Sequence, residues 1–231
     1  SVTGVQTCAL PIYLDSIAAC GDVNRNVTCS SHPKQSRVHE EIFEYAARIS
    51  EMALPKTKAF YEIWLDKEQL TNKEEEKDPL YQDRYLPRKF KIAIAIPPNN
   101  DVDVLSNDLG IIAVVENEQL IGFNITAGGG LGTTHGNPGT YPRLGSLLGF
   151  CEAGDKTMKA IYEIITIQRD FGNRSDRKLS RLKYTIDKMG VDAFKNELEA
   201  RCGFALAPAK PYVFTERRDY YGWQQNHEGK W

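Results

Sequence analysis

The stretch YLPRKFKIAIAIPP, at residues 85–98, constrains the fold more than any other part of the sequence. Successive side chains of a β-strand point to opposite faces of its sheet. A strand over 89–96 therefore has one face of large apolar side chains and one face of lysines and alanines. The apolar face carries Phe90, Ile92, Ile94 and Ile96, and the other carries Lys89, Lys91, Ala93 and Ala95. The first face predicts a buried core. The second predicts either contact with a bulky anion or a strand end whose lysines are solvated.

Composition is typical of a globular protein and excludes several classes of function. The chain has 231 residues, 41% of them hydrophobic and 26% charged, with a formal net charge of −2. This balance argues against a nucleic-acid or membrane-surface protein, so that any basic site must be local. No apolar run approaches the length of a membrane span. The five cysteines form no close metal-binding pair, and a chain of this size and composition predicts a reducing, cytoplasmic compartment.

The N-terminal segment SVTGVQTCALPI differs in character from the rest of the chain. It is uncharged, lacks periodicity and has no basic region of the kind that begins a signal peptide. Its part VTGVQTCALPI matches the reading-frame translation of a common short-read sequencing adapter. We therefore interpret residues 1–12 as a sequencing artefact and expect the natural chain to begin near Tyr13, inside a gene. The ending NHEGKW predicts truncation at the C-terminus as well.

Periodicity and turn residues predict a mixture of helices and strands. Ser36 is expected to cap a helix over 37–53, after a polar loop over 22–35. Two apolar runs around the turn ENEQ predict a β-hairpin over 110–127, followed by a Gly-rich loop to residue 143. Asp155 is expected to cap a further helix. Besides the helix at 37–53, one helix is expected to end near residue 20, and three others are expected at 155–170, 175–189 and 192–201. A strand is expected at 59–66. The tail over 211–223 is expected to be strand or loop.

The expected helix 175–189 carries the most basic segment of the chain. At 100° per residue, Arg174, Arg177, Arg181 and Lys188 fall within roughly 60° of one another. Such a stripe is more often a solvated face than a binding site. The histidines do not show HxxxH or HExxH spacing, which argues against metal-dependent hydrolysis.

Three basic segments are distant in sequence: NRN at 24–26, RKFK at 88–91 and GNRSDRKLSRLK at 172–183. If they converge, they form a pocket for a polyanion. Arginine suits carboxylates because its guanidinium donates two parallel hydrogen bonds. Lysine suits proton delivery because neighbouring cations or burial bring its pKa towards neutrality. Asn24 and Asn26 are expected either to orient Arg25 or to support its loop.

Four motifs together resemble the haemoprotein (beta) subunit of assimilatory sulfite reductase, over essentially all of residues 13–231. They are AACGDVNRNVTC, LPRKFKIAIAIPPNNDVDV, GFNITAGGGLGTTHGN and QRDFGNRSDRKLSRLKYT. The resemblance implies an α+β sulfite/nitrite reductase sirohaem-binding domain, with a mixed sheet, flanking helices and an incomplete chain. It implies sirohaem coupled to a [4Fe–4S] cluster, and reduction of sulfite to sulfide by six electrons. A flavoprotein (alpha) subunit using NADPH and flavins would deliver those electrons.

The resemblance also implies roles for individual residues. Arg25, Lys89 and Lys91 would hold the sulfite oxygens, and the lysines would supply protons. Cofactor contacts would come from Asn26, Arg88, Gly129, Gly130, Arg174, Arg177, Arg181 and Lys183. The assignment of Lys183 rests on the resemblance alone, because the helical wheel puts it away from the basic stripe. On this basis the lysine and alanine face of the strand is expected to face the macrocycle.

The resemblance divides the chain into the artefact at 1–12, a helical lead-in with the Arg loop at 13–56, and a truncated first sirohaem domain at 57–231. The cluster cysteines of the family lie in a second repeat that this sequence lacks, so no metal ligand is expected here. An upstream arginine of the anion site is missing too. We therefore expect the chain alone to be inactive. Two alternatives stay open: a ferredoxin-dependent sulfite or nitrite reductase of the same fold, and a non-catalytic tetrapyrrole-binding fragment.

Overall fold

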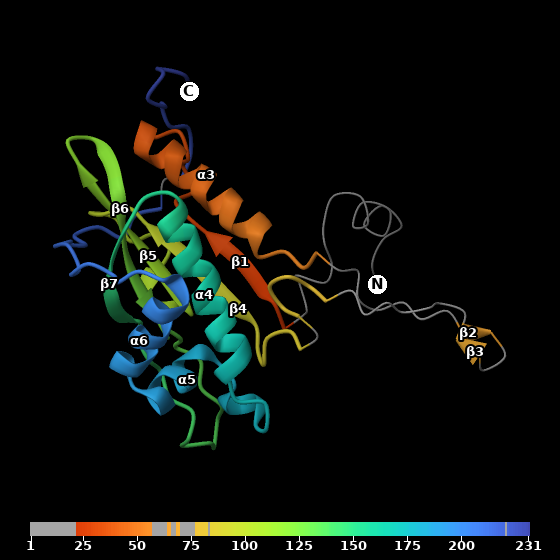
Figure 1. Ribbon diagram of the computed structural model, residues 1–231. Coiled ribbons are helices and arrows are strands. Elements are labelled where there is room, and N and C mark those ends of the chain that lie inside the picture. The colour runs from red at the N-terminus through yellow and green to blue at the C-terminus, as the bar shows by residue number, and fades with distance from the viewer. Residues whose placement is uncertain (1–21, 57–63, 66–67, 70–76, 83, 220) are drawn as a thin grey trace.

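The computed structural model describes residues 22–56, 64–65, 68–69, 77–82, 84–219 and 221–231. A mixed five-stranded sheet lies at its centre, in the order β1-β4-β5-β6-β7 (Figure 1). These strands are β1 (Asn24–Thr28), β4 (Phe90–Ala95), β5 (Leu109–Glu116), β6 (Gln119–Ala127) and β7 (Ser146–Glu152). A second sheet consists of β2 (Trp64–Leu65) and β3 (Glu68–Gln69). The helices are α3 (Arg37–Met52), α4 (Asp155–Phe171), α5 (Leu182–Met189) and α6 (Val191–Cys202), with 3₁₀ turns η1 (Val104–Ser106) and η2 (Arg177–Leu179).

Strand direction changes across the central sheet. β1, β4 and β5 run parallel, with Ile94 beside Ile111, whereas β6 and β7 are antiparallel to their neighbours. The expected hairpin is confirmed as β5 and β6. Its turn residues Asn117 and Glu118 have φ of 52° and 61°, the left-handed conformation that two-residue hairpin turns require. The fold is therefore the expected α+β arrangement of a mixed sheet with flanking helices.

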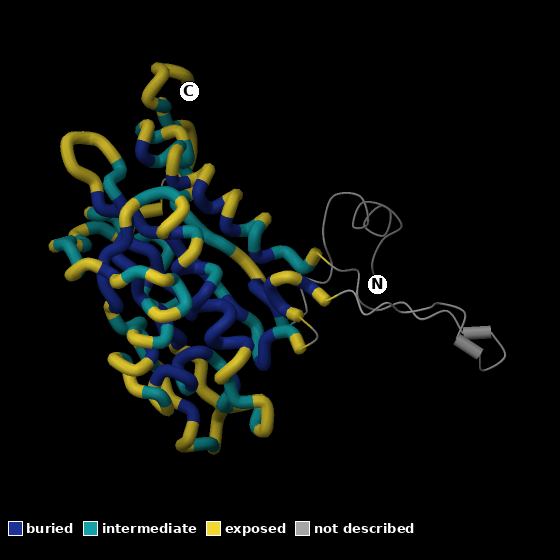
Figure 2. The backbone as a smooth tube through the Cα atoms, viewed as in Figure 1, coloured by how far each residue is buried: buried dark blue, intermediate teal, exposed yellow. Residues whose placement is uncertain are grey.

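The helices cover one face of the sheet (Figure 1). The expected apolar face of β4 is confirmed: Phe90, Ile92 and Ile94 are at most 1% exposed and belong to the main core. Apolar residues of α3 and α4, such as Ile42 and Ile161, complete that core, which runs through the centre of the molecule in Figure 2. None of the helices in the described ranges has the length and apolarity needed to span a membrane.

The opposite face of β4 is only partly open. Ala93 and Ala95 are fully buried in a second, smaller core that includes Val104 and Ile112, and Tyr212 and Phe214 of the C-terminal tail pack against it. The expectation that the whole lysine and alanine face turns to a macrocycle is therefore wrong for its alanine end. The chain's own tail fills the space that the small side chains leave.

The tail is fastened by a buried amide. Asn124, fully buried on β6, donates to the carbonyl of Lys210 at 2.8 Å and accepts from its N–H at 2.9 Å. The side chain thus satisfies both backbone groups of one tail residue, as a neighbouring strand would. This leaves the lysine end of β4 as the polar part of the face.

Two elements differ from expectation because tertiary contacts override local propensity. The polar segment 22–35 was expected to be a loop, yet Asn24–Thr28 forms the edge strand β1 beside β4. Strand β7, within residues 146–152, was not expected at all. It adds to the sheet through β6, and residue 207 of the tail bridges to its Phe150.

The expected helix over 175–189 is wrong in its first half. Residues 172–181 contain only the short turn η2, and the α-helix starts at Leu182. The side chain of Asp176 accepts the Lys178 N–H at 2.8 Å, a local bond that competes with helix formation. The basic stripe from the helical wheel therefore does not exist as a helix face.

The other helices agree with expectation. Ser36 caps α3 by accepting the His39 N–H, and α6 covers the range expected near 192–201. Asp155 is the first residue of α4 rather than its cap, because Gly154 occupies the cap position. The described residues of the tail form no regular strand, which agrees with the loop alternative. The expected helix ending near residue 20 lies outside the described residues, as does most of the expected strand 59–66.

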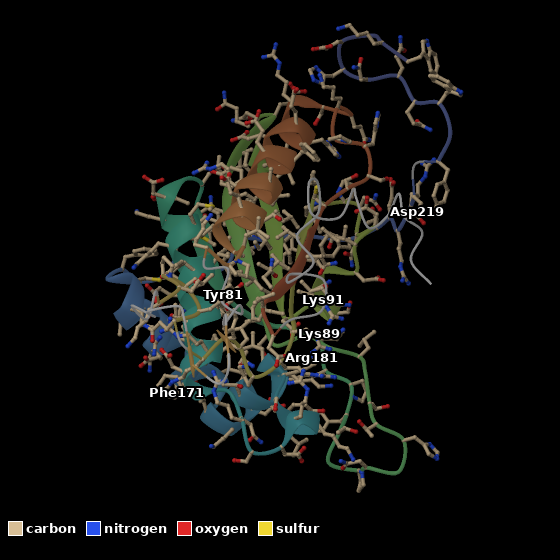
Figure 3. All side chains as sticks on the ribbon, turned by 90° about the vertical axis from the view of Figure 1, so that its right-hand side faces the viewer. Tyr81, Lys89, Lys91, Phe171, Arg181 and Asp219 are labelled. Atoms are coloured by element: carbon tan, nitrogen blue, oxygen red, sulfur yellow. The ribbon has the colours of Figure 1, made fainter. Side chains whose placement is uncertain are left out.

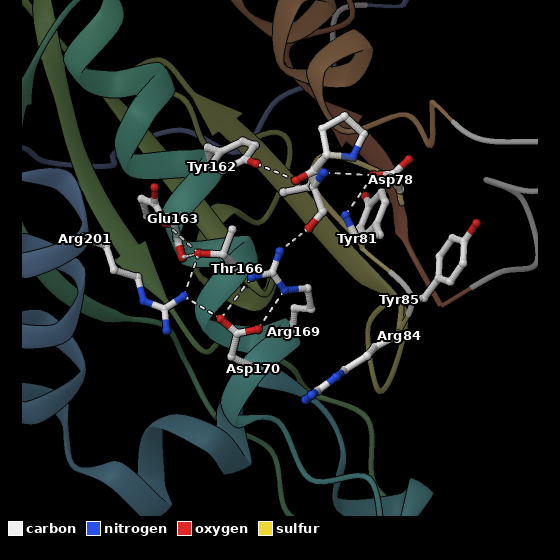
Figure 4. A network of polar contacts seen from close by, with 12 residues as sticks. Asp78, Tyr81, Arg84, Tyr85, Tyr162, Glu163, Thr166, Arg169, Asp170 and Arg201 are labelled. Atoms are coloured by element: carbon white, nitrogen blue, oxygen red, sulfur yellow. Dashed lines mark hydrogen bonds and ion pairs between the residues drawn. The ribbon is translucent and has the colours of Figure 1, made fainter. Parts of the chain in front are cut away.

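A polar network ties the segment before β4 to the helices (Figure 4). Arg169 of α4 is nearly buried and donates to the Leu80 carbonyl at 2.6 Å. Its guanidinium also pairs with Asp170, which in turn accepts from Arg201 of α6 at 2.8 Å. Tyr162 adds a bond to the carbonyl of residue 79. The chain that leads into Lys89 is thus held against α4, and Arg201 of α6 in turn bonds to α4.

Candidate anion-binding site

Four cationic side chains from the three basic segments meet near the start of β4. Lys89 and Lys91 lie beside Arg181 in Figure 3, and all three are partly buried. Arg25 comes from the exposed side of β1, which runs parallel to β4. The charges of Lys91, Arg181 and Arg25 all act on Lys89. The convergence that the sequence left conditional is therefore present, with at least one cation from each segment.

The environment of Lys89 favours release of its proton. Burial contributes most, followed by the Lys91 ammonium and the guanidinium groups of Arg181 and Arg25, and together they lower the pKa of Lys89 from 10.5 to about 8. Such a lysine is mostly charged at neutral pH but gives up its proton more readily than a solvated one. The group therefore suits both attraction of an anion and proton delivery.

Arg181 is fixed by a buried carboxylate. Its Nε and Nη2 donate to the two oxygens of Asp108 at 3.1 Å and 2.8 Å. Asp108 is fully buried directly before β5, and its Oδ2 also accepts the backbone N–H of Lys91 at 3.1 Å. Burial raises the pKa of Asp108, while Arg181 and the Lys91 N–H oppose that rise. The ion pair thus joins Arg181 to the strand that carries both lysines.

The Gly-rich loop packs against the chain itself. A Cβ on Gly129 would lie 2.2 Å from the Leu105 carbonyl oxygen, and one on Gly130 would lie 2.9 Å from Nη1 of Arg181. These two glycines are buried and allow close approach between protein segments. By contrast, a Cβ on Gly132 or Gly136 would meet nothing within 4 Å.

Lys183 lies in the interior rather than at a surface. It is fully buried, and its ammonium donates to the carbonyls of Gly130 at 3.1 Å, of Gly132 at 2.9 Å and of Tyr141. The Tyr184 ring centroid lies 4.9 Å from its Nζ. Burial lowers the pKa of Lys183. With its hydrogen-bond donors directed at loop carbonyls, this lysine clamps the Gly-rich loop.

The remaining predicted cofactor residues are dispersed. Arg177 forms a bidentate pair with Asp22, with both distances at 2.7 Å. Arg174 donates to backbone carbonyls, including that of Tyr85 at 2.7 Å. Asn26 is exposed on β1 opposite Lys91, and Arg88 is partly buried just before Lys89. The structure therefore joins Arg181 to the predicted catalytic residues and engages Arg174, Arg177 and Lys183 elsewhere.

The described residues suit one of the two cofactors that the resemblance implies, sirohaem, but not the other, a [4Fe–4S] cluster. A [4Fe–4S] cluster needs four thiolates. Within the described ranges, the free cysteines are Cys29, Cys151 and Cys202, and no group of three or more Cys, His, Asp or Glu could hold a metal ion. These residues do not fit a cluster. The convergent cations do fit the carboxylates of a sirohaem or a small oxyanion.

Fold and geometry together define an α+β domain in which several cationic side chains lie near the start of β4. The family model described as "Nitrite and sulphite reductase 4Fe-4S domain" matches residues 44–206. The chain belongs to this nitrite and sulphite reductase family, which confirms the resemblance seen in its motifs.

Individual relatives agree with the family. The chain is 61% identical over 220 residues to the "Sulfite reductase (NADPH) hemoprotein beta-component" of Leptospira biflexa serovar Patoc, covering 95% of this chain and 40% of the relative. It is 53% identical over 219 residues to the protein of that name from Bacillus subtilis strain 168, covering 94% and 38%. The solved structure of Mycobacterium tuberculosis NirA protein matches with a TM-score of 0.65 at 25% identity, over 91% of this chain and 33% of that one. The chain thus spans about two fifths of the length of the curated relatives.

Asp108 is the site residue that sequence reasoning missed. Its only signal is an acidic residue directly before the apolar run LGIIAVV. A charged residue at the entry to a buried strand is ordinarily read as solvated. Its partner Arg181 lies 73 positions away, so their pairing has no local signature.

Proposed function

We propose that this chain is the anion-binding part of the hemoprotein subunit of an NADPH-dependent sulfite reductase. The observation that carries the proposal is the convergence of Lys89, Lys91, Arg25 and Arg181. It gains support from 61% identity to a relative named as such a hemoprotein. The complete enzyme would reduce sulfite to sulfide and would receive electrons through a flavoprotein subunit.

The residues of the chain have separable tasks in this proposal. Arg25 and Lys91 bind the sulfite oxygens, and Arg181 provides a fixed positive charge next to them. Lys89, with its pKa of about 8, donates a proton to an oxygen of the bound anion as an S–O bond breaks. Sirohaem, when bound, would supply the iron that carries electrons to the sulfur. Ligands for the cluster would have to come from outside the described residues.

The ferredoxin-dependent alternative has less support. Both relatives at 53–61% identity carry NADPH in their names. The choice of electron donor by the complete enzyme decides between the two. A non-catalytic tetrapyrrole-binding module has no need of a lysine tuned for proton release, so the lowered pKa of Lys89 disfavours it.

Binding of sulfite to the chain tests the site without turnover. We expect sulfite to shift the ¹³Cε NMR signals of Lys89 and Lys91, and Lys89→Met to weaken binding roughly tenfold because one charge-assisted contact is lost. The exposed Lys188 serves as the matched control, and Lys188→Met should bind as the parent does. Equal shifts at Lys188 and Lys89, or none at either, would contradict the proposed site.

Binding should also weaken at alkaline pH. The pKa of Lys89 is lowered to about 8, so the ammonium loses its proton as the pH rises through that value. Sulfate is a suitable probe because its own charge stays constant between about pH 6 and 10. We expect calorimetry to show sulfate affinity falling between about pH 7 and 9. A flat affinity up to about pH 10, where an ordinary lysine titrates, would show that Lys89 is not the group involved.

The chain alone should not reduce sulfite. Its described residues lack the ligand set for the cluster, so electrons have no route to the bound anion. The assay supplies dithionite-reduced methyl viologen and sulfite to the purified chain and measures sulfide. Sulfide production above the protein-free rate would refute this expectation.

A further inference from the structure

Asp108 connects three parts of the site through one residue. Its carboxylate grips Arg181 through two hydrogen bonds and accepts the Lys91 N–H, as described above. Its backbone carbonyl accepts the Gly128 N–H at 2.8 Å, at the start of the Gly-rich loop. One fully buried residue thus holds the cation, the lysine strand and the loop in register.

The burial of this carboxylate is costly and calls for a reason. A charge taken out of water is tolerated only when it is paired and hydrogen-bonded, and apolar replacements are often at least as stable. Asp108 sits deeper than its partner, whose side chain is 17% exposed. The pair therefore presents the outer part of Arg181 towards the site while its acidic half stays inside.

We propose that Asp108 is a positioning residue for the anion site, because its carboxylate holds the Arg181 guanidinium and the backbone N–H of Lys91 close to Lys89. It does not touch the anion in this proposal, which rests on the function proposed above. Asp108 acts through the geometry of its partners.

The charges around Lys89 show how removal of Asp108 would change the pKa of Lys89. Lys89 faces Lys91 on its own strand, Arg25 from β1 and Arg181 from the segment before α5, all of them positive. Asp108, before β5, carries a negative charge that interacts with the charge of Lys89. Loss of this carboxylate removes an attraction, so the titration midpoint of Lys89 should fall further below 8.

Two variants and one control test the proposal on the 231-residue chain. Asp108→Asn keeps an acceptor for the Lys91 N–H and removes the charge that grips Arg181. Asp108→Glu keeps the charge but lengthens the side chain, so it moves the guanidinium. Asp103 lies in the same loop as Asp108 and forms an exposed ion pair with Arg217 of the tail. The control Asp103→Asn removes that ion pair. The measurements are the sulfite dissociation constant of the folded protein and the Lys89 midpoint by ¹³Cε NMR without sulfite.

Positioning predicts that Asp108→Asn weakens sulfite binding roughly fivefold or more, and that Asp108→Glu weakens it roughly twofold or more. The Lys89 midpoint should fall in Asp108→Asn, and the control should match the parent in both respects. If Asp108 acted only through its charge, Asp108→Asn would bind sulfite more tightly, because removal of a carboxylate makes the site more positive. Equal or tighter binding in Asp108→Asn would therefore overturn the proposal, as would parental affinity with reduced stability alone.

Failure of folding or of sulfite binding is also covered by this design. If Asp108→Asn does not fold, parental affinity in Asp108→Glu overturns the proposal, and weakened affinity supports it. If the parent chain binds no sulfite, the proposed function fails, and the Lys89 midpoint in Asp108→Glu, which keeps the charge, still decides the role of Asp108. A parental midpoint in Asp108→Glu would then reject that role, and a changed midpoint would support it.

Discussion

Lys183→Met should destabilise the folded chain by about 3–5 kcal/mol, because it leaves buried acceptors without their donor. The ammonium donates to the carbonyls of Gly130, Gly132 and Tyr141, and it has no exposed surface. Methionine fills a similar volume but offers no hydrogen. Urea unfolding followed by circular dichroism measures the loss.

Lys188→Met is the matched control for this experiment. Lys188 is on the same helix, α5, but its side chain is exposed. Its replacement should change the free energy of unfolding by no more than about 0.5 kcal/mol. Equal stability of the two variants would show that Lys183 is not the clamp of the Gly-rich loop.

Gly129→Ala should cost about 3 kcal/mol of stability, because the new methyl group collides with backbone atoms. Its Cβ would lie 2.2 Å from the Leu105 carbonyl oxygen and 2.5 Å from that of Asn107. Backbone atoms cannot rotate away as a flexible side chain does, so the loop itself must shift. Thermal unfolding monitored by circular dichroism reports the effect.

Gly132→Ala provides the comparison within the same loop. A Cβ at that position meets nothing within 4 Å, so the parental melting temperature is expected. If both alanine variants melt together, the tight contact between Gly129 and the segment 105–107 is not a feature of the folded chain.

Elements that depend on local pattern could be predicted from the sequence. The alternation in FKIAIA is enough to specify a strand whose large apolar side chains share one face, and Ser36 with its following apolar periodicity is enough to specify α3. The hairpin of β5 and β6 follows from two apolar runs around a short turn. In each case the deciding interactions lie within a few residues of one another.

Elements that depend on distant partners could not be predicted. β1 is polar and becomes a strand only because β4 offers it an edge. Asn124 is polar on a buried strand because the tail 86 positions away supplies its partner. The same limit applies to the candidate site. The motif resemblance predicted Arg25, Lys89 and Lys91 as substrate residues and Lys183 as a cofactor contact, whereas the ammonium of Lys183 donates to loop carbonyls. The hydrogen bonds of Asp108 all reach distant segments, so its position before an apolar run did not reveal its role.

Turnover by the complete enzyme tests the central claim most directly. Sequencing the genomic locus on both sides of this coding region would give the full reading frame. The protein that it encodes would be assayed for sulfide formation with its flavoprotein and NADPH. The proposal predicts sulfite reduction in the parent and in Lys188→Met, and a kcat lowered roughly 100-fold or more in Lys89→Met, the usual cost of losing a proton donor. No sulfite reduction by the complete polypeptide, or an unchanged kcat in Lys89→Met, would contradict it.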